Sequence, residues 1–240
     1  NIGKRAILHF VLFCRFLAFF TDRAGETWES SRFLSRRALS CRPGFDFTRK
    51  VVISLEPMTP TVLPLSLSQQ NIWALEQACP GTSINHICTT LYLHGTVDLS
   101  ALQRSIHLVL AADPSLNTRI TLRDGVPMQY QVPYQPAPIP VYDFSLGWEE
   151  GADRWVESFA REPLPLLDAP LCRFVLLRTG EDRCRLVVKM HHLISDGWTQ
   201  TLLCNRVGQA YLDLLAGREP SLDAIPSYAG HVEEEQRYLA

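Results

Sequence analysis

The sequence predicts an α/β sandwich of the α+β class, in which helices pack on a mostly antiparallel sheet. Three observations support this prediction. Apolar residues recur at helical spacing in some segments, they alternate with polar residues in others, and turn-forming sequences separate neighbouring strands. The 240 residues are 46% hydrophobic and 20% charged, which is a globular composition. We therefore expect one ordinary domain, or one large domain cut short.

In the first half of the domain, predicted helices and strands alternate. We expect a helix over 66–78, a strand over 86–94, a helix over 98–112, and strands over 116–122 and 126–132. Asp98 is the expected N-cap of the second helix. Arg123-Asp124-Gly125 is a hairpin signal that joins the last two strands. The apolar side of the first helix consists of Leu67, Ile72, Trp73 and Leu75.

The second half begins with a proline-rich extended connection over 133–140. We expect a helix over 148–161 capped by Ser145, strands over 171–178 and 184–192, and a helix over 198–216 ended by Gly217. The last helix is amphipathic. Its predicted buried stripe contains Trp198, Leu202, Leu203, Val207, Ala210, Tyr211, Leu214 and Leu215.

The segment before Met58 differs in texture from the rest of the chain. Residues 6–20 are mostly apolar and follow two basic residues, as in a signal peptide or a membrane anchor. Against this, Arg15 interrupts the run, no small-residue cleavage site follows, and the run is short for a bilayer span. A disordered or accessory leader and translated upstream sequence are the other interpretations. We treat residues 1–57 as a leader outside the domain at 61–240.

Charge and cysteine content exclude several classes of protein. The net charge is −2 and no basic residues cluster, so we expect no nucleic-acid partner. The seven cysteines are an odd number and contain no Cys-x-x-Cys pair, which disfavours a zinc site and a disulfide framework. We interpret them as reduced thiols in a cytoplasmic protein without a membrane partner.

The segment from His191 to Gly197 carries the candidate chemistry. It reads His-His-x-x-x-Asp-Gly and follows an apolar run at 186–190. A neutral imidazole can accept a proton from a nucleophile near physiological pH, which favours acyl transfer. The Asp can hold the loop, and the Gly lets the backbone turn where a side chain would clash. Adjacent residues on a strand point to opposite faces, so His191 and His192 are not expected to bind one metal ion with Asp196.

Other polar residues have a simpler interpretation. The remaining histidines of the domain show no partner pattern and are expected to be structural or exposed: His86, His94, His107 and His231. Trp73 is expected in the core, and Glu233-Glu234-Glu235 is expected on a solvated helix face.

Several segments, in order, resemble the condensation domain of nonribosomal peptide synthetases. Residues 65–73 resemble its first motif, with matches at Ser66, Gln69 and Trp73 and variants at Ser68, Asn71 and Ile72. Residues 95–98 resemble its strand-to-helix step, and residues 191–197 match its third motif in full. The resemblance covers about residues 61 to 240.

This chain departs from the second motif of the family. Residues 112–120 keep Leu116 and Thr118, but both arginines of that motif are missing. In the family, one of these arginines is thought to support the Asp of the third motif. Arg119 and Arg173 are the candidate replacements that would support Asp196, and the sequence does not choose between them.

The resemblance implies a chloramphenicol acetyltransferase-like two-layer sandwich, of which this chain is the N-terminal lobe. It also implies amide-bond formation, with His192 facing a tunnel between two lobes. There His192 positions or deprotonates the amine, or stabilises the tetrahedral species. His191 packs inward, Asp196 is structural, and Gly197 with the N–H groups at the helix start lies near the developing oxyanion.

The same resemblance implies the partners. No tightly bound cofactor or metal is expected, because donor and acceptor arrive on phosphopantetheine arms of carrier domains, beside an adenylation domain in the longer protein. An ester-forming or CoA-dependent acyltransferase of the same fold is one alternative. A non-catalytic, carrier-binding remnant is the other, and we expect no turnover from residues 1–240 alone.

Overall fold

The computed structural model describes residues 61–146, 149–223, 225 and 228–239, so the prediction of a leader at 1–57 lies outside the described residues. The elements follow in the order β1 (Val62–Pro64), α1 (Leu67–Ala78), β2 (His86–His94), α2 (Leu99–Ala112), a 3-10 turn (Pro114–Asn117), β3 (Thr118–Arg123), β4 (Val126–Gln131), β5 (Val141–Asp143), α3 (Glu149–Arg161), β6 (Cys172–Arg178), β7 (Arg183–His191), α4 (Gly197–Leu215) and α5 (Tyr228–Leu239).

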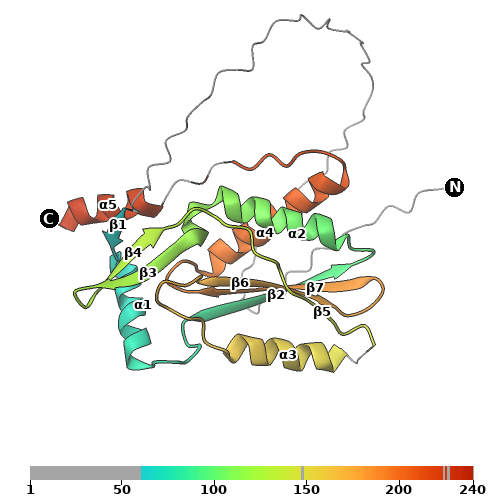
Figure 1. The fold of residues 1–240 in the computed structure, drawn as a ribbon, viewed down its shortest axis with the longest axis horizontal. Coiled ribbons are helices and arrows are strands. Elements are labelled where there is room, and N and C mark those ends of the chain that lie inside the picture. Colours follow the sequence, from blue (N-terminus) through green and yellow to red (C-terminus); the bar gives the residue numbers. More distant parts are fainter. Residues whose placement is uncertain (1–60, 147–148, 224, 226–227, 240) are drawn as a thin grey trace, which may run out of the picture. The chain divides into compact units, whose positions relative to one another are not determined.

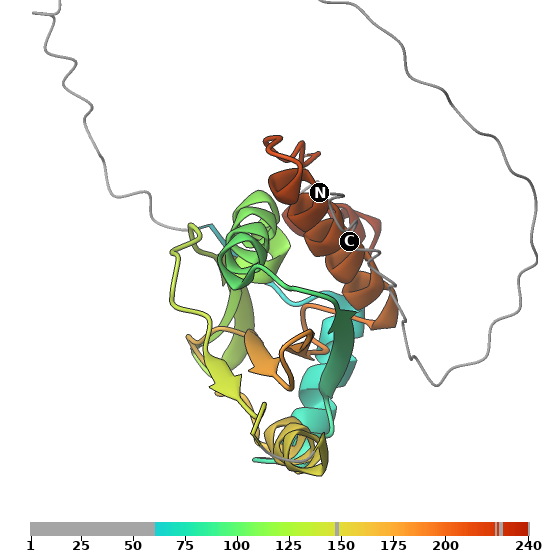
Figure 2. The same ribbon diagram turned by 90° about the vertical axis from the view of Figure 1, so that its right-hand side faces the viewer.

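A four-stranded sheet in the order β2-β7-β6-β5 forms the centre of the fold. Its first three strands are antiparallel, and β5 runs parallel to β6. Helices α2 and α4 lie on one face of this sheet and α3 lies on the other (Figure 1, Figure 2). The predicted mixture of helices with a mostly antiparallel sheet is confirmed, and all four predicted long helices form.

The main core lies between this sheet and the α2–α4 layer. Ile106 and Val109 of α2, Leu176 and Leu186 of the sheet, and Val207 of α4 are all at most 2% exposed. Burying one such side chain stabilises a fold by roughly 1.5–3 kcal/mol. A smaller cluster packs α3 on the opposite face, through residues that include Ala152, Phe159 and Val187. The histidine motif therefore follows the end of β7, a strand that is packed on both faces of the sheet.

The smaller sheet, in the order β1-β4-β3, contains the predicted hairpin. Asp124 and Gly125 both have positive φ, 51° and 78°, as a two-residue type I′ turn requires. Strand β3 begins at Thr118, two residues later than predicted, because Pro114 opens a 3-10 turn. Strands β1 and β5 were not predicted, since three residues are too few for an alternating pattern.

Helix α1 buries a different face from the one its apolar residues predict. Leu67 and Leu75 are 46% and 42% exposed, whereas Gln69 and Glu76 are 3% and 8% exposed. The prediction of an apolar packing side was wrong at these two leucines, because the neighbouring surface offers polar partners to the opposite face. These partners are Leu193 and His191 of the histidine motif, together with Gln129 and Asn85.

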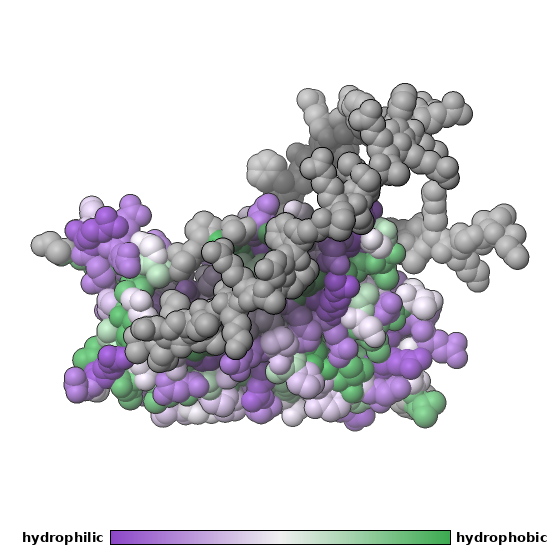
Figure 3. Space-filling model, turned by 45° about the horizontal axis from the view of Figure 1, so that its top comes forward, coloured by the Kyte–Doolittle hydropathy of each residue, from purple (hydrophilic) through white to green (hydrophobic). Residues whose placement is uncertain are grey.

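Helix α4 also differs from its predicted stripe. Leu203, Val207, Ala210 and Tyr211 are buried as predicted, but Trp198 is 69% exposed and Leu202 and Leu215 are also exposed. The described surface is mixed, with apolar and polar residues interspersed on the face shown in Figure 3. Gly217 ends α4 with a φ of 69°, as expected of a C-terminal glycine.

Helix α5 contacts the start of α1 through two side chains. The Glu235 carboxylate accepts a hydrogen bond from the Leu67 amide at 2.9 Å, and the Tyr228 hydroxyl lies 3.0 Å from Ser66 Oγ. Glu233 and Glu234 are exposed, as predicted, while Glu235 is partly buried and makes an exposed contact with α1. No helix among the described residues is both long and apolar enough to cross a bilayer.

Candidate functional site

The histidine motif forms the connection between β7 and α4. His191 is the last residue of β7, and α4 begins at Gly197 directly after its N-cap, Asp196. Backbone hydrogen bonds anchor both histidines at the end of β7. The His191 N–H donates to the Leu171 carbonyl at 2.9 Å, and the His192 N–H donates to the Asn85 carbonyl at 2.8 Å. The backbone at the start of the turn is therefore held by main-chain contacts alone.

Asp196 has a capping role. Its Oδ1 accepts hydrogen bonds from the backbone N–H and the hydroxyl of Thr199, both at 2.7 Å. These bonds hold the pKa of Asp196 below its ordinary value, because they stabilise the carboxylate. The side chain satisfies one of the free amides at the start of α4.

The two candidate arginines lie elsewhere. Arg173 pairs with Glu162 at 3.1 Å, and Arg119 donates to the carbonyl of Thr118 at 3.0 Å. Both line a cavity of about 1000 Å³ between the proline-rich connection, β6 and α3, whose lining does not include Asp196 or His192. The expected arginine support of Asp196 is therefore not found among the described residues, because Thr199 takes that place.

Gly197 is not required by the backbone. Its φ lies outside the left-handed region, and a Cβ added there would meet no atom within 4 Å. The prediction of a sharp turn that only glycine permits was wrong, since Gly197 is the first residue of a regular helix. The absence of a side chain instead leaves open space at the helix start.

His192 is half-buried and its ring orientation is set by one contact. Its Nδ1 lies 3.1 Å from the carbonyl oxygen of Ser195. A carbonyl oxygen only accepts, so Nδ1 carries the proton and the lone pair of the neutral ring is on Nε2. No described residue forms a hydrogen bond with this Nε2.

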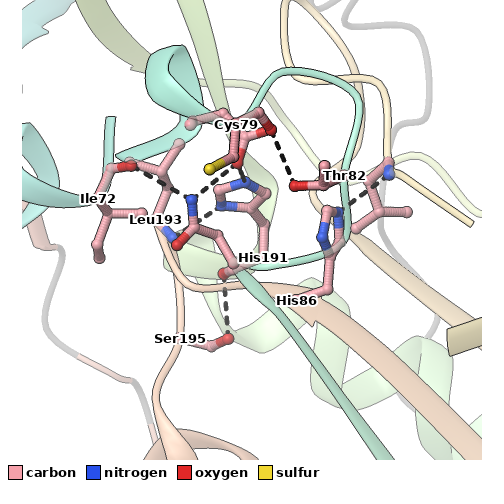
Figure 4. Close-up of polar contacts among 10 residues, drawn as sticks. Ile72, Cys79, Thr82, His86, His191, Leu193 and Ser195 are labelled. Carbon is pink, nitrogen blue, oxygen red and sulfur yellow. Dashed lines mark hydrogen bonds and ion pairs between the residues drawn. The ribbon is translucent and has the colours of Figure 1, made fainter. Parts of the chain in front are cut away.

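His191 is fully buried behind the turn, with the opposite tautomer (Figure 4). Its Nδ1 accepts a hydrogen bond from the Leu193 amide at 3.1 Å, so the proton of the neutral ring is on Nε2. This Nε2 lies 3.4 Å from Oε2 of Glu76, a long contact that is weaker than a full hydrogen bond. Burial lowers the pKa of His191 to about 4, only partly opposed by Glu76, so the ring is neutral at physiological pH.

His86 lies beside His191. Its ring contacts the ring of His191 edge to face at 5.0 Å between centroids, and its Nε2 accepts a hydrogen bond from the Leu164 amide at 3.0 Å. Burial also lowers the pKa of His86, with Lys189 contributing in the same direction. The structural interpretation of this histidine is consistent with its position.

Helix α1 holds the turn from the other side. The Gln69 side chain donates to the carbonyl of Leu193 at 2.9 Å and exchanges hydrogen bonds with the Gln129 side chain. Gln69 also forms a capping box with Ser66, in which the side chain of each accepts from the backbone N–H of the other. The match of Ser66 and Gln69 to the first motif was visible in the sequence. The involvement of Glu76 and Asn85 was not, because Glu76 lies on a polar face of α1 and Asn85 in the turn before β2, and periodicity reveals neither.

Metal ligation is not supported within the described part of the chain. No group of three or more His, Cys, Asp or Glu side chains there could hold a metal ion. The five described cysteines are all free thiols.

A family model described as the condensation domain matches residues 60–240 of the chain. The chain belongs to the condensation domain family. Surfactin synthase subunit 1 of Bacillus subtilis (strain 168) is 30% identical over 183 residues, which are 74% of this chain and 5% of that protein. Nonribosomal peptide synthetase kk1B of Curvularia clavata is 32% identical over 161 residues, covering 67% of this chain and 1% of that protein.

Solved condensation domains share the fold. The first condensation domain of the CDA synthetase superposes with a TM-score of 0.67 at 25% identity, covering 75% of this chain and 47% of that one. The starter condensation domain of rhizomide synthetase RzmA gives a TM-score of 0.69 at 22% identity, covering 75% and 44%. This confirms the fold expected from the motifs. The chain spans less than half of these solved chains and at most 5% of these two curated relatives.

Proposed function

We propose that the described residues form the part of a condensation domain that supplies the reactive histidine for amide-bond formation. The geometry of His192 is the observation that carries this proposal. Its Nδ1–H is committed to the Ser195 carbonyl, so Nε2 is available as a proton acceptor. The neighbouring His191 cannot play this part, because it is buried and its ring nitrogens face Leu193 and Glu76.

The reaction is the attack of an amine on a thioester. The amine nitrogen bonds to the thioester carbonyl carbon, and the surplus proton of the amine passes to Nε2 of His192. The tetrahedral intermediate then collapses with cleavage of the carbon–sulfur bond, and the leaving thiolate takes the proton from the imidazolium. An amide and a thiol result, and His192 returns to its neutral form. A fixed Nε2 also orients the amine for this attack.

The start of α4 is placed to stabilise the oxyanion of the intermediate. The amides of Gly197 and Trp198 have no acceptor among the described residues, whereas the amide of Thr199 is taken by Asp196. Free N–H groups at a helix N-terminus attract negative charge, and the open space at Gly197 gives access to them. The donor and acceptor arrive as thioesters on phosphopantetheine arms of carrier domains, as in the wider family, and an adenylation domain loads one of them.

The test is a single-turnover condensation assay on the longest native polypeptide that contains residues 61–240, with donor and acceptor loaded on their carriers. His192→Ala is expected to lower the rate by about 10²–10⁴-fold, the usual contribution of a general base. His94→Ala, at the exposed end of β2, is the matched control and is expected to leave the rate unchanged. An unchanged rate in His192→Ala would remove His192 from the reaction.

The same assay separates the other functions. Transfer to an alcohol in place of an amine, or from acyl-CoA in place of a carrier thioester, would indicate an ester-forming or CoA-dependent enzyme. Carrier binding without any turnover would indicate a non-catalytic remnant. We expect residues 1–240 by themselves to give no turnover, because solved condensation domains are about twice as long as the matching part.

A further inference from the structure

Glu76 occupies a buried position on α1 that no sequence motif marks. It is 8% exposed and is the one acidic residue of that helix. Its Oε2 accepts a hydrogen bond from Asn85 Nδ2 at 2.8 Å and lies 3.4 Å from His191 Nε2. A carboxylate taken out of water needs such partners, so its burial beside the histidine turn requires an explanation.

One oxygen of Glu76 meets both donors. The His191 ring thus accepts a hydrogen bond at Nδ1 from the Leu193 amide, and its Nε2 faces the carboxylate at 3.4 Å. A donor at one ring nitrogen and a carboxylate facing the other favour one orientation and one tautomer. Because Leu193 follows His192 directly, the orientation of the His191 ring fixes the backbone on one side of His192.

Asn85 fixes the other side. Its carbonyl accepts the hydrogen bond from the His192 amide, while its side chain is held by Glu76 and by the carbonyl of Ile72 at 3.3 Å. Figure 4 shows that Ile72, His191 and Leu193 lie close to one another. Glu76 therefore reaches the backbone of His192 by two routes, through the His191 ring and through Asn85.

We infer that Glu76 is a positioning residue for His192, acting through His191 and Asn85. This inference rests on the proposed function of His192. Because a single oxygen makes both contacts, the reach of the side chain matters more than its charge. Glu76→Gln keeps an oxygen at the same reach and retains the arrangement. Glu76→Asp keeps the charge, but its shorter side chain withdraws the oxygen from both donors.

The first test uses ring ¹⁵N NMR on the 240-residue chain labelled at histidine. In the wild type and in Glu76→Gln, His191 is expected to show one tautomer, protonated at Nε2, and His192 one tautomer, protonated at Nδ1. In Glu76→Asp, both rings are expected to show mixed tautomers. Gln77→Asn, an exposed shortening by one methylene at the next position, controls for the helix and leaves both rings unchanged. His191 protonated at Nδ1 in the wild type, or Glu76→Asp spectra identical to the wild type, would overturn the inference.

The second test measures condensation kinetics in the longest native polypeptide. Glu76→Asp is expected to lower kcat by about 10-fold or more without changing KM for either carrier, as expected when a catalytic group is misplaced but binding is intact. Glu76→Gln restores kcat to near the wild-type value. A loss in Glu76→Gln with none in Glu76→Asp would show that charge, and not reach, is what matters. Either that result or equal losses in the two variants would overturn the inference.

The two tests separate this inference from the proposed function. If His192→Ala leaves condensation unchanged, the proposed function fails, while the ring spectra still decide whether Glu76 holds the two histidines. If His192→Ala abolishes condensation but Glu76→Asp behaves as the wild type in both tests, the proposed function stands and the positioning role fails.

Discussion

Nδ1 of His192 lies 3.1 Å from the carbonyl oxygen of Ser195, three residues further along the chain. This contact decides which ring nitrogen is available for chemistry, because the carbonyl requires a proton on Nδ1. The next residue, Asp196, caps α4 and so fixes the position of that carbonyl. A strand end, a four-residue turn and a helix start together hold one imidazole in one orientation.

Asp196→Ala is expected to destabilise the 240-residue chain by about 1 kcal/mol, the usual cost of losing a helix N-cap. Asp196→Asn keeps an acceptor for the Thr199 amide and is expected to cost much less. Urea unfolding at neutral pH measures both variants. Because the pKa of Asp196 is lowered, its contribution is complete above about pH 4 and is lost as the pH falls further. Equal stability of Asp196→Ala and the wild type would show that the cap is unimportant.

Gly197→Ala is expected to leave the free energy of unfolding unchanged or to raise it by up to ~1 kcal/mol. The position is helical, a Cβ there meets no atom within 4 Å, and alanine is the better helix former. Thermal or urea unfolding of the chain measures the effect. A loss above about 1 kcal/mol would mean that the backbone does need glycine at this position.

Much of the fold follows from patterns in the sequence. The helical period of Leu102, Ile106 and Val109 and the Asp98 cap predicted α2, and Asp124-Gly125 predicted the hairpin. Strands β1 and β5 escaped prediction, because three residues show no alternation and form only by pairing with distant strands. The exposure of Trp198 and Leu202 was not predicted, because an apolar helix face in a sequence does not show which surface, if any, packs against it.

The site was predictable where a motif marks it. His191, His192 and Asp196 lie together in the turn, as the spacing of the motif predicts. Glu76 and Asn85 carry no such signal, because a buried polar residue is recognised only by its partners in space. The sequence also did not show that Thr199, and not an arginine, contacts Asp196. In the structure Thr199 offers two donors to the same carboxylate oxygen.

The stability of the chain is expected to fall between pH 6.5 and pH 4. Burial lowers the pKa of His191 from 6.5 to about 4, so in this range the unfolded chain binds a proton that the folded chain does not. Stability is complete above pH 6.5, and the loss approaches ~1.4 kcal/mol per pH unit for one such ring. His86, whose pKa burial also lowers, acts in the same direction. Urea unfolding at pH 7.5, 6 and 5 measures this loss, and constant stability over the series would contradict the buried neutral rings.

Glu235→Gln is expected to destabilise the chain by about 0.3–1 kcal/mol at low ionic strength, because the carboxylate offsets the positive end of α1. The loss should shrink as salt is added, since the interaction is exposed to solvent. Glu234→Gln, exposed on the same helix, is the matched control and is expected to have no effect. Equal behaviour of the two variants in urea unfolding would mean that Glu235 does not cap α1.

The ring ¹⁵N spectrum of His192 in the wild-type chain at pH 7.5 tests most directly whether the turn presents a proton acceptor. We predict a single tautomer, with the proton on Nδ1 and an unprotonated Nε2. A ring protonated at Nε2 would contradict the proposed role of His192.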